Sequence, residues 1–313
     1  MSQVNVGTVH VDAALTNLAI AYRQTSGFVA DQAMKTIRVN KESDKFYKWD
    51  RGNSFRIPET KRSDGAKSNK VVFDLSQSNY QVEEYALNAD VTDRQVANAD
   101  SVLKLRASKM RFVQDLLMLD REKRVSTLLT TTGNYDSACY VTKSGSTQWN
   151  DSSFSGSIEK DIDTGKEAVR ALMGVEPNTI IIPAAVAKVM KRDAMIRELI
   201  KYTQNDLLIN GDLPPSIFNM KVLIPTAVNI TSVRGASSTT TADVWGKNVV
   251  MTYIPTEGSI DTPAHAYTFR SRDFLVKSWR EEDMSKEVIE VSIMDDEVIT
   301  SDISGYLLSS VIA

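Results

Sequence analysis

The sequence contains few of the residues from which many catalytic and metal sites are built. Its 313 residues include a single cysteine, Cys139, and two histidines, His10 and His265. One cysteine excludes an intramolecular disulfide and any metal site made of several cysteine ligands. A lone thiol fits a protein made in a reducing cytoplasm. The two histidines are far apart and neither lies in a ligand pattern, so we interpret both as incidental to any catalysis.

No motif of nucleotide, metal or hydrolytic chemistry is complete. Gly165 and Lys166 resemble the end of a phosphate-binding loop, but the first glycine of that loop is missing and Glu167 replaces its hydroxyl residue. No nucleophile lies in a recognisable strand–turn–helix elbow. A triad assembled from distant segments stays open. We expect no catalytic, cofactor-binding or metal-binding residues, and the pattern favours a binding or structural role.

Long hydrophobic runs and a large excess of one charge are also missing. The formal net charge of −3 argues against binding nucleic acid or a membrane surface through overall charge. No apolar run approaches the ~20 residues that span a bilayer. The N-terminus, MSQVNVGTVH, lacks the basic start and apolar core of a signal peptide. We expect a soluble protein made inside the cell, with no membrane partner.

One long segment contains nothing that breaks a helix. Residues 100–129 include neither proline nor glycine, which predicts a helix on the order of 45 Å long at ~1.5 Å per residue. Thr92 followed by Gln95 fits a capping box, and Asp100 offers a second N-cap. We expect the helix to lie on other structure, because apolar residues recur at helical spacing. One row of them is Met110, Val113, Leu117, Val125 and Leu128.

Residues 36–85 carry strand patterns around a polar centre. Apolar and polar residues alternate at 37–39, 55–57 and 71–75, which is the period of a strand. Residues 58–69 are polar and rich in turn formers. We predict a long two-stranded hairpin with a projecting tip. Because an isolated hairpin is marginally stable in water, it should rest on the body of the protein or on a neighbour.

The hairpin is basic and the C-terminal part is acidic. Residues 38–70 hold ten lysines and arginines against five acidic residues, with interleaved aromatics at Phe46, Tyr47, Trp49 and Phe55. Basic and aromatic residues together can bind single-stranded nucleic acid by stacking, but we favour aromatics that pack across strands. Residues 281–302 hold nine acidic residues against Lys286. Opposite charges in two parts of one chain suit contacts between copies.

Strands and helices alternate after the long helix. We expect helices over residues 158–172 and 184–203, and short strands over 178–183, 221–224 and 248–255. Short links between them predict a compact α/β unit. Strand patterns return near residues 267–283 and 286–302, and the apolar C-terminus is expected to join a sheet. The whole chain is predicted to be α+β.

This order of parts resembles the major capsid protein of tailed bacteriophages, with its HK97-like fold. Residues 86–103 resemble that family's approach to its spine helix, and Glu122 with Leu128 and Leu129 resembles its ExxxxxLL-like helix end. Residues 167–193 resemble its helix, IIIP strand and following helix. The resemblance implies five parts, listed in chain order: an N-terminal arm at 1–35, a β-hairpin E-loop at 36–85, a P-domain at 86–157 with a spine helix at about 100–129, an A-domain at 158–265, and a β return to the P-domain at 266–313.

The resemblance also implies a function and partners. The chain would be a structural subunit, not an enzyme, that self-assembles as hexamers and pentamers into an icosahedral head around double-stranded DNA without reading its sequence. Further implied partners are a portal protein, a separate scaffolding protein and decoration proteins. Assembly would occur in the bacterial host cytoplasm, and the final location would be the virion capsid. Two alternatives stay open: an encapsulin-type nanocompartment shell, and an oligomeric α/β enzyme with a β-arm.

We predict that the basic hairpin contacts an acidic surface of a neighbouring copy. The basic set comprises Arg51, Arg56, Lys61 and Arg62. The acidic set comprises Glu281, Glu282, Asp283, Asp295, Asp296 and Glu297. We also expect one face of the long helix to remain available to the lumen or to a neighbour, with Lys104, Lys109, Arg111, Arg121 and Arg124. Exposed ion pairs contribute only ~0.2–1 kcal/mol each, so apolar hairpin contacts must add to them.

Overall fold

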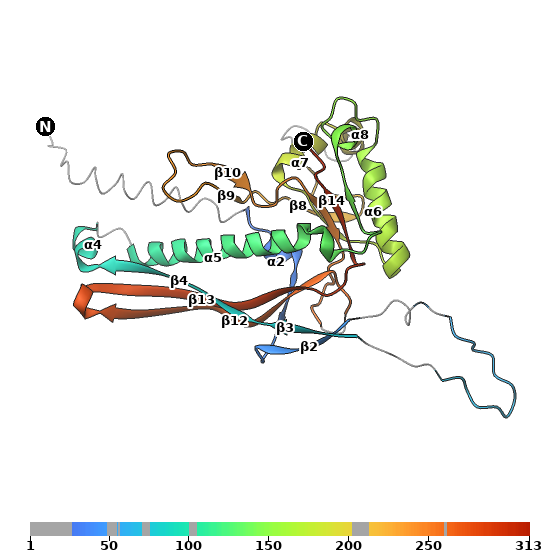
Figure 1. The fold of residues 1–313 in the computed structure, drawn as a ribbon, viewed down its shortest axis with the longest axis horizontal. Helices are drawn as coiled ribbons and strands as arrows, with labels where there is room; N and C mark the ends of the chain where they lie inside the picture. Colours follow the sequence, from blue (N-terminus) through green and yellow to red (C-terminus); the bar gives the residue numbers. More distant parts are fainter. Residues whose placement is uncertain are drawn as a thin grey trace.

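Two β-sheets organise an elongated molecule (Figure 1). The computed structural model describes residues 27–48, 55, 57–70, 76–99, 105–201, 213–259 and 262–313, without the side chains of 199–201. A long sheet and a long helix run side by side away from a compact block, and a loop projects from the opposite side (Figure 1). This mixture of helices and sheets is the predicted α+β class.

The long sheet has four strands in the order β1-β12-β13-β4. They are β1 (Lys35–Arg38), β12 (Ala266–Glu281), β13 (Lys286–Ile299) and β4 (Glu83–Thr92). The predicted C-terminal strands are therefore one long antiparallel hairpin, turned by the 3-10 segment Glu282–Met284. β1 pairs with β12 in parallel. The predicted 36–85 hairpin is wrong on this point, because an alternating pattern identifies a strand but not its partner.

The long helix is present as α5, which spans Leu105–Thr130. Before it, α4 (Asp93–Asn98) carries the predicted capping box between Thr92 and Gln95. Asp100, the second predicted cap, lies outside the described residues. Val113 and Leu117 of α5 pack on Val291 of β13, so the first part of the predicted apolar row faces the long sheet. Val125 and Leu128, at the end of the row, pack in the core of the compact block.

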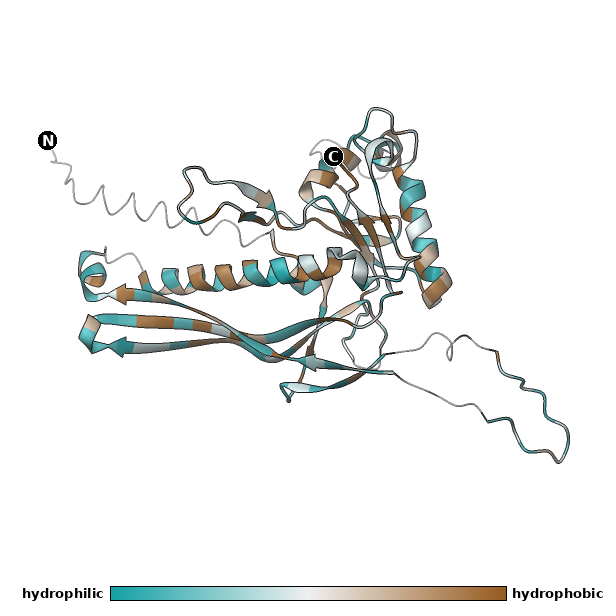
Figure 2. Ribbon diagram, in the orientation of Figure 1, coloured by the Kyte–Doolittle hydropathy of each residue, from teal (hydrophilic) through white to brown (hydrophobic). Residues whose placement is uncertain are grey.

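The compact block is built on a six-stranded sheet in the order β5-β14-β11-β6-β8-β7. Its strands are β5 (Tyr140–Thr142), β14 (Gly305–Ser309), β11 (Val249–Thr252), β6 (Thr179–Ile181), β8 (Met220–Leu223) and β7 (Ser216–Ile217). Hydrophobic residues gather in its inner strands, whereas the projecting loop is largely hydrophilic (Figure 2). The predicted C-terminal strand is β14, and it lies in this block. Strands from outside residues 158–265 thus complete the sheet.

Three helices belong to the same block: α6 (Ile158–Met173), α7 (Ala184–Met190) and α8 (Ala194–Lys201). Gly165 lets α6 approach the sheet, because a Cβ there would lie 2.7 Å from the Tyr306 ring. The single helix predicted over 184–203 is wrong, since it breaks into α7 and α8. The Asp193 side chain accepts hydrogen bonds from the amides of Met195 and Ile196 at 3.0 and 3.2 Å, which starts a new helix.

Two smaller hairpins complete the described chain. β9 (Val228–Ile230) pairs with β10 (Thr241–Asp243), and β2 (Ser43–Lys48) pairs with β3 (Ser76–Gln81). The β2–β3 pair is the base of the predicted E-loop; the predicted strand at 71–75 lies outside the described residues. Phe46 is buried and its ring lies 5.6 Å from that of Phe269. Phe46 therefore packs across strands, as the favoured interpretation of the aromatics requires.

His265 is fully buried, and Tyr135 stacks on its ring at 4.7 Å. Its Nδ1 donates to the carbonyl of Ser301 at 2.8 Å, while Nε2 has no partner among the described residues. Burial lowers the pKa of His265 to about 4 from 6.5.

We expect His265 to make stability pH-dependent. Because its folded pKa is depressed, its contribution is complete above about pH 6.5 and is lost as the pH falls towards 4, on the order of 3 kcal/mol in total. His265→Asn keeps a donor for Ser301 but does not titrate in this range. Denaturant unfolding measured from pH 7 to pH 4 should show that the free energy of unfolding depends less on pH in the variant than in the wild type. An equal pH dependence in both proteins would contradict the depressed pKa of His265.

Within the described ranges, no helix combines the length and apolarity that crossing a bilayer requires. The same ranges hold no group of three or more histidine, cysteine, aspartate or glutamate side chains placed to bind a metal ion. Cys139 is a free, buried thiol.

Candidate assembly site

A buried carboxylate anchors the first described residues to the long helix. Glu122 of α5 is completely buried. Its carboxylate accepts from the amide of Val29 at 3.1 Å, from the amide of Ala30 at 2.8 Å and from the indole Nε1 of Trp245 at 2.6 Å. Because two of these donors are adjacent amides at the start of α2 (Ala30–Ala33) and the third is on a distant part of the chain, Glu122 fixes the direction in which the chain enters that helix. We call this set the Glu122 clamp.

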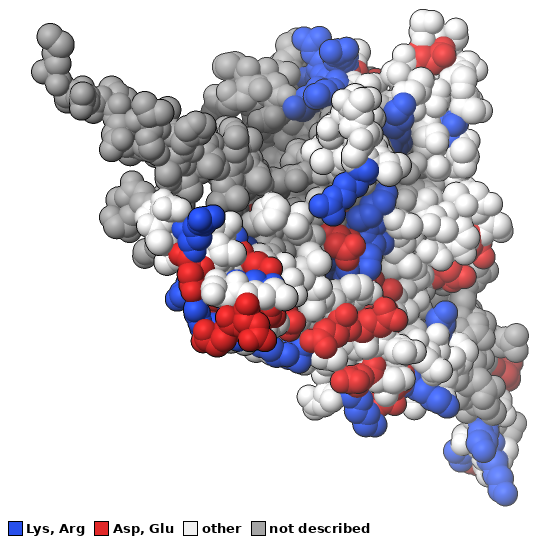
Figure 3. All heavy atoms as spheres, turned by 60° about the vertical axis from the view of Figure 1, so that its left-hand side comes forward, with Lys and Arg blue, Asp and Glu red and all other residues white. Residues whose placement is uncertain are grey.

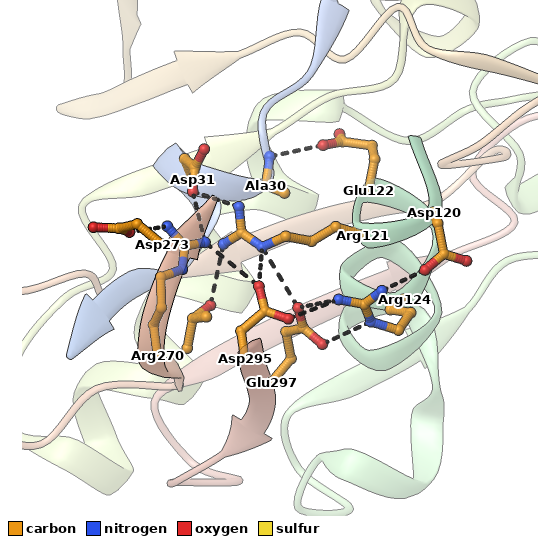
Figure 4. Close-up of polar contacts among 11 residues, drawn as sticks. Ala30, Asp31, Asp120, Arg121, Glu122, Arg124, Arg270, Asp273, Asp295 and Glu297 are labelled. Carbon is orange, nitrogen blue, oxygen red and sulfur yellow. Dashed lines mark hydrogen bonds and ion pairs between the residues drawn. The ribbon is translucent and has the colours of Figure 1, made fainter. Parts of the chain in front are cut away.

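Beside Glu122 on the same helix, arginines meet acidic side chains of β13 (Figure 4). Arg124 donates to Asp295 at 3.0 Å and to Glu297 at 3.0 Å. Arg121 lies 3.3 Å from Asp295 and also pairs with Asp31 of α2. The ion network thus ties α2, α5 and β13 together.

The network extends to β12 and is closed by an aromatic ring. Arg270 of β12 lies 3.5 Å from Asp295. The guanidinium of Arg124 lies 3.6 Å from the centre of the Tyr85 ring, within the range of a cation–π contact. Buried charges of this kind are stable only while they are paired. The arrangement therefore stiffens the junction at which helix, sheet and N-terminal segment meet.

Burial opposes the ionised form of two carboxyls at this junction. Desolvation raises the pKa of Asp295, with a further rise from Glu297, against the attraction of the arginines. Desolvation also raises the pKa of Glu122, although Trp245 and the amides of Val29 and Ala30 act the other way. Asp295 and Glu122 are thus kept ionised by the groups that donate hydrogen bonds or positive charge to them.

Two of the predicted acidic partners are internal groups, and a third is partly covered. The prediction of a partner surface at Asp295 and Glu297 is wrong: the Asp295 side chain is 0% exposed and that of Glu297 is 6% exposed. The physical reason is that both carboxylates are covered by arginines of α5, which lie more than 170 residues earlier in the sequence. Asp296 is partly buried and accepts from the amide of Gln81 at 2.9 Å. The prediction of an open helix face is also wrong at Arg121 and Arg124, since the same ion pairs bury Arg121 and partly cover Arg124.

The other three predicted acidic residues lie at the surface. Glu282 and Asp283 are exposed and Glu281 is partly exposed, all at the turn between β12 and β13. Acidic side chains gather on the end of the long sheet that comes forward in Figure 3. Part of this charge is already paired within the chain, because Arg280 contacts Asp93 and Glu282 at 2.7 and 2.8 Å.

The projecting loop contains the described half of the predicted basic set. Every residue from 57 to 70 is exposed, including Lys61, Arg62 and the 93%-exposed Ile57. Arg51 and Arg56 lie outside the described residues. The structure does not bring Lys61 and Arg62 near the acidic turn of the same chain: the loop and that turn lie at opposite ends (Figure 1). A contact between the two sets requires a second copy.

Sequence reasoning did not identify the role of Glu122 as a clamp, although a signal was present. Glu122 lies three and seven residues before Val125 and Leu129, both fully buried. At helical spacing it therefore belongs to the apolar stripe. A charged residue in such a position must be paired inside the fold.

Comparison with known proteins shows the family. A model described as phage capsid protein matches residues 76–283, which is more than half of the chain. The chain belongs to the phage capsid protein family. The major capsid protein of Burkholderia phage BcepMu is 28% identical over 96% of this phage capsid protein and 96% of its own length. The major capsid protein of Pseudomonas phage JBD67 is 26% identical over 72% and 69% of the two chains.

Solved structures show the fold. A phage-related protein from Bordetella bronchiseptica RB50 matches this phage capsid protein with a TM-score of 0.69 at 21% identity, covering 95% of this chain and 96% of that one. An encapsulin from Synechococcus elongatus PCC 7942 matches with a TM-score of 0.54 at 11% identity, covering 90% of this chain and 86% of that one. The fold is the predicted HK97-like capsid fold, which shells of both kinds share.

Proposed function

We propose that this phage capsid protein is the major capsid protein of a phage head and assembles into its shell through the projecting loop. The loop carries the proposal, because residues 57–70 are all exposed and stand away from the body of their own chain. Such a loop is free to lie on another copy. One loop and one receiving surface per copy make a heterologous contact, which closes into rings and shells.

We infer the finer organisation from the same geometry. The five predicted parts, from N-terminal arm to β return, describe how one copy contributes to hexamers and pentamers of an icosahedral shell. The shell would enclose double-stranded DNA without reading its sequence, in keeping with the net charge of −3. A portal protein, a scaffolding protein and decoration proteins complete the proposed partners, and the bacterial cytoplasm is the proposed place of assembly.

The family match favours a phage head over the two alternatives. The encapsulin neighbour shares the fold at 11% identity, whereas the family match and both curated relatives are phage capsid proteins. Membership of a structural family likewise favours a subunit over an oligomeric α/β enzyme. Particles containing DNA would support the phage head; particles filled with a cargo enzyme would support the nanocompartment.

Negative-stain electron microscopy of the purified protein tests the function, and hollow polyhedral particles are the expected result. Reversing the charge at Arg51, Arg56, Lys61 and Arg62 together should lower particle yield and weaken its dependence on salt, because exposed pairs are screened by salt. A matched variant reverses four exposed basic residues away from the loop: Lys160, Lys188, Arg192 and Arg234. If the loop variant assembles like the wild type, these residues do not contact a neighbour.

A further inference from the structure

A second apolar row on α5 lies outside the cluster that this helix forms with the long sheet. Phe112 and Leu119 lie seven residues apart and therefore share one side of the helix. Both are partly exposed, and Leu116 beside them is 39% exposed. Ser126 continues this side seven residues after Leu119, and its hydroxyl donates to the carbonyl of Val244 at 2.8 Å. The row thus leads to the segment that follows β10.

The β9–β10 hairpin extends from the compact block on the same side as α5 (Figure 1). Ile230 of β9 is 64% exposed, and Val233 in the connecting loop is 82% exposed. Thr241 faces Ile230 across the two strands and is exposed as well. The two strands form a sheet of their own, and such a hairpin is marginally stable in water without a further contact. We therefore expect another segment to cover its apolar side.

The N-terminal part of the same chain arrives beside this hairpin. Gly27 is the first described residue, and its carbonyl accepts from the amide of Thr226, two residues before β9, at 3.2 Å. The five residues from Gly27 back to Tyr22 reach up to about 17 Å when they are extended. Ile230 is four residues beyond Thr226, which is about 13 Å of strand. Residues that precede Arg23 can therefore reach the hairpin.

Residues 11–22 lie outside the described residues, and their sequence suits such a contact. Four apolar residues recur in this segment at helical spacing: Val11, Leu15, Leu18 and Tyr22. Asp12 is the only charged residue of the segment. An apolar row of this kind is stabilised when it is removed from water against other apolar groups. The hairpin and the outer row of α5 offer such groups within reach of the segment.

We propose that residues 11–22 fold back over their own subunit and bind between the β9–β10 hairpin and the outer row of α5. The apolar row of the segment covers Ile230 and Val233 on the hairpin and Leu116 on the helix. The short connection to Gly27 holds the segment at an effective concentration on the order of millimolar, which favours it over the same segment of another copy. The contact also removes an exposed apolar patch through which free subunits would associate.

Labelling of engineered cysteines in the unassembled subunit tests this contact. Thr241→Cys reports on the hairpin and Leu116→Cys reports on the helix, each through the rate of its reaction with a maleimide. The native Cys139 is buried, and burial raises its pKa to about 12, so its own reaction is slow. Because both reporter positions are exposed among the described residues, slow labelling in the full chain would indicate a cover.

Two changes within the segment are compared at each reporter. Leu15→Ser with Leu18→Ser removes the centre of the apolar row and should speed labelling at both reporters tenfold or more. Thr16→Ser with Asn17→Ser changes polar residues of the same segment and should leave both rates unchanged. Val175→Cys, which follows α6 on the opposite side of the block, should react equally fast in every background. Equal rates for the two changes at either reporter would overturn the proposal.

Dilution separates the proposed occupant from a second copy. Labelling that stays equally slow over a hundredfold dilution supports a segment of the same chain. Labelling that quickens on dilution would assign the cover to another copy and would overturn the proposal.

A final comparison needs no disruptive change. In an otherwise natural chain, Leu18→Cys should react several-fold more slowly than Thr16→Cys, because only Leu18 belongs to the covered row. Equal rates for these two cysteines would also overturn the proposal. All of these measurements use free subunits, so a failure to form particles would bear on the proposed function alone.

Discussion

Glu122→Ala is expected to lower the free energy of unfolding of the unassembled subunit by about 3–5 kcal/mol. The side chain is fully buried and accepts hydrogen bonds from the amides of Val29 and Ala30 and from Trp245. Removing it leaves three buried donors without an acceptor, each costing about 1–3 kcal/mol, and creates a cavity. Chemical denaturation of the purified subunit measures the change.

Two matched variants separate the clamp from general effects on the helix. Lys123→Ala changes the next, exposed residue and should alter stability by less than about 0.5 kcal/mol. Glu122→Gln keeps one acceptor oxygen but places an amide group beside the donors. Its loss of stability should therefore lie between those of Glu122→Ala and Lys123→Ala. Hydrogen exchange at Val29 and Ala30 should quicken in Glu122→Ala. If that exchange is unchanged, the clamp does not hold this segment.

Arg121→Met is expected to cost about 3–5 kcal/mol, because it leaves buried carboxylates short of a partner. Asp295 is fully buried and would face only Arg124 and Arg270. Asp31 would lose its contact with the helix. Methionine retains much of the volume of arginine, so the loss reports on charge more than on packing. The same unfolding experiment measures it.

A double-mutant cycle shows whether Arg121 and Asp295 act together. Asp295→Asn alone removes a charge that three arginines share. Once Arg121 is replaced, the same change removes less attraction, so the double variant should be less destabilised than the sum of the single variants, by about 0.5–3 kcal/mol. Additive losses would mean that Arg121 does not stabilise this carboxylate.

Local patterns predicted many of the elements and few of their partners. The capping box at Thr92, the long α5 helix and the C-terminal strands follow from spacing and turn chemistry, which act over short distances. Ile37 shows the limit: its alternating neighbours identify a strand, but its parallel pairing with Phe269 depends on a residue far along the chain. The same holds for the division of 184–203 at Asp193, where no proline or glycine marks the break.

The candidate site was harder to predict than the fold. An acidic segment appears solvated when its sequence is considered alone, yet Asp295 and Glu297 meet Arg121 and Arg124 only after folding. The clamp at Glu122 also depends on backbone amides, which have no sequence signature. By contrast, the loop at Lys61 and Arg62 was predicted correctly as exposed, because a polar segment rich in turn formers has little apolar surface to bury.

The two kinds of contact have different roles in a shell. The Glu122 clamp and the ion network hold α2, α5 and the long sheet as one stiff unit, so the orientation of that unit is set before copies meet. The projecting loop remains exposed. Assembly then requires little reorganisation within the subunit, which lowers the entropic cost of association.

A cryo-electron microscopy reconstruction of the purified particles tests this view of the protein most directly. It should show a closed icosahedral shell in which residues 57–70 of each copy lie against an adjacent copy, with the Glu122 clamp and ion network intact inside every subunit. Open aggregates, small oligomers, or shells in which the loop folds back onto its own chain would contradict it.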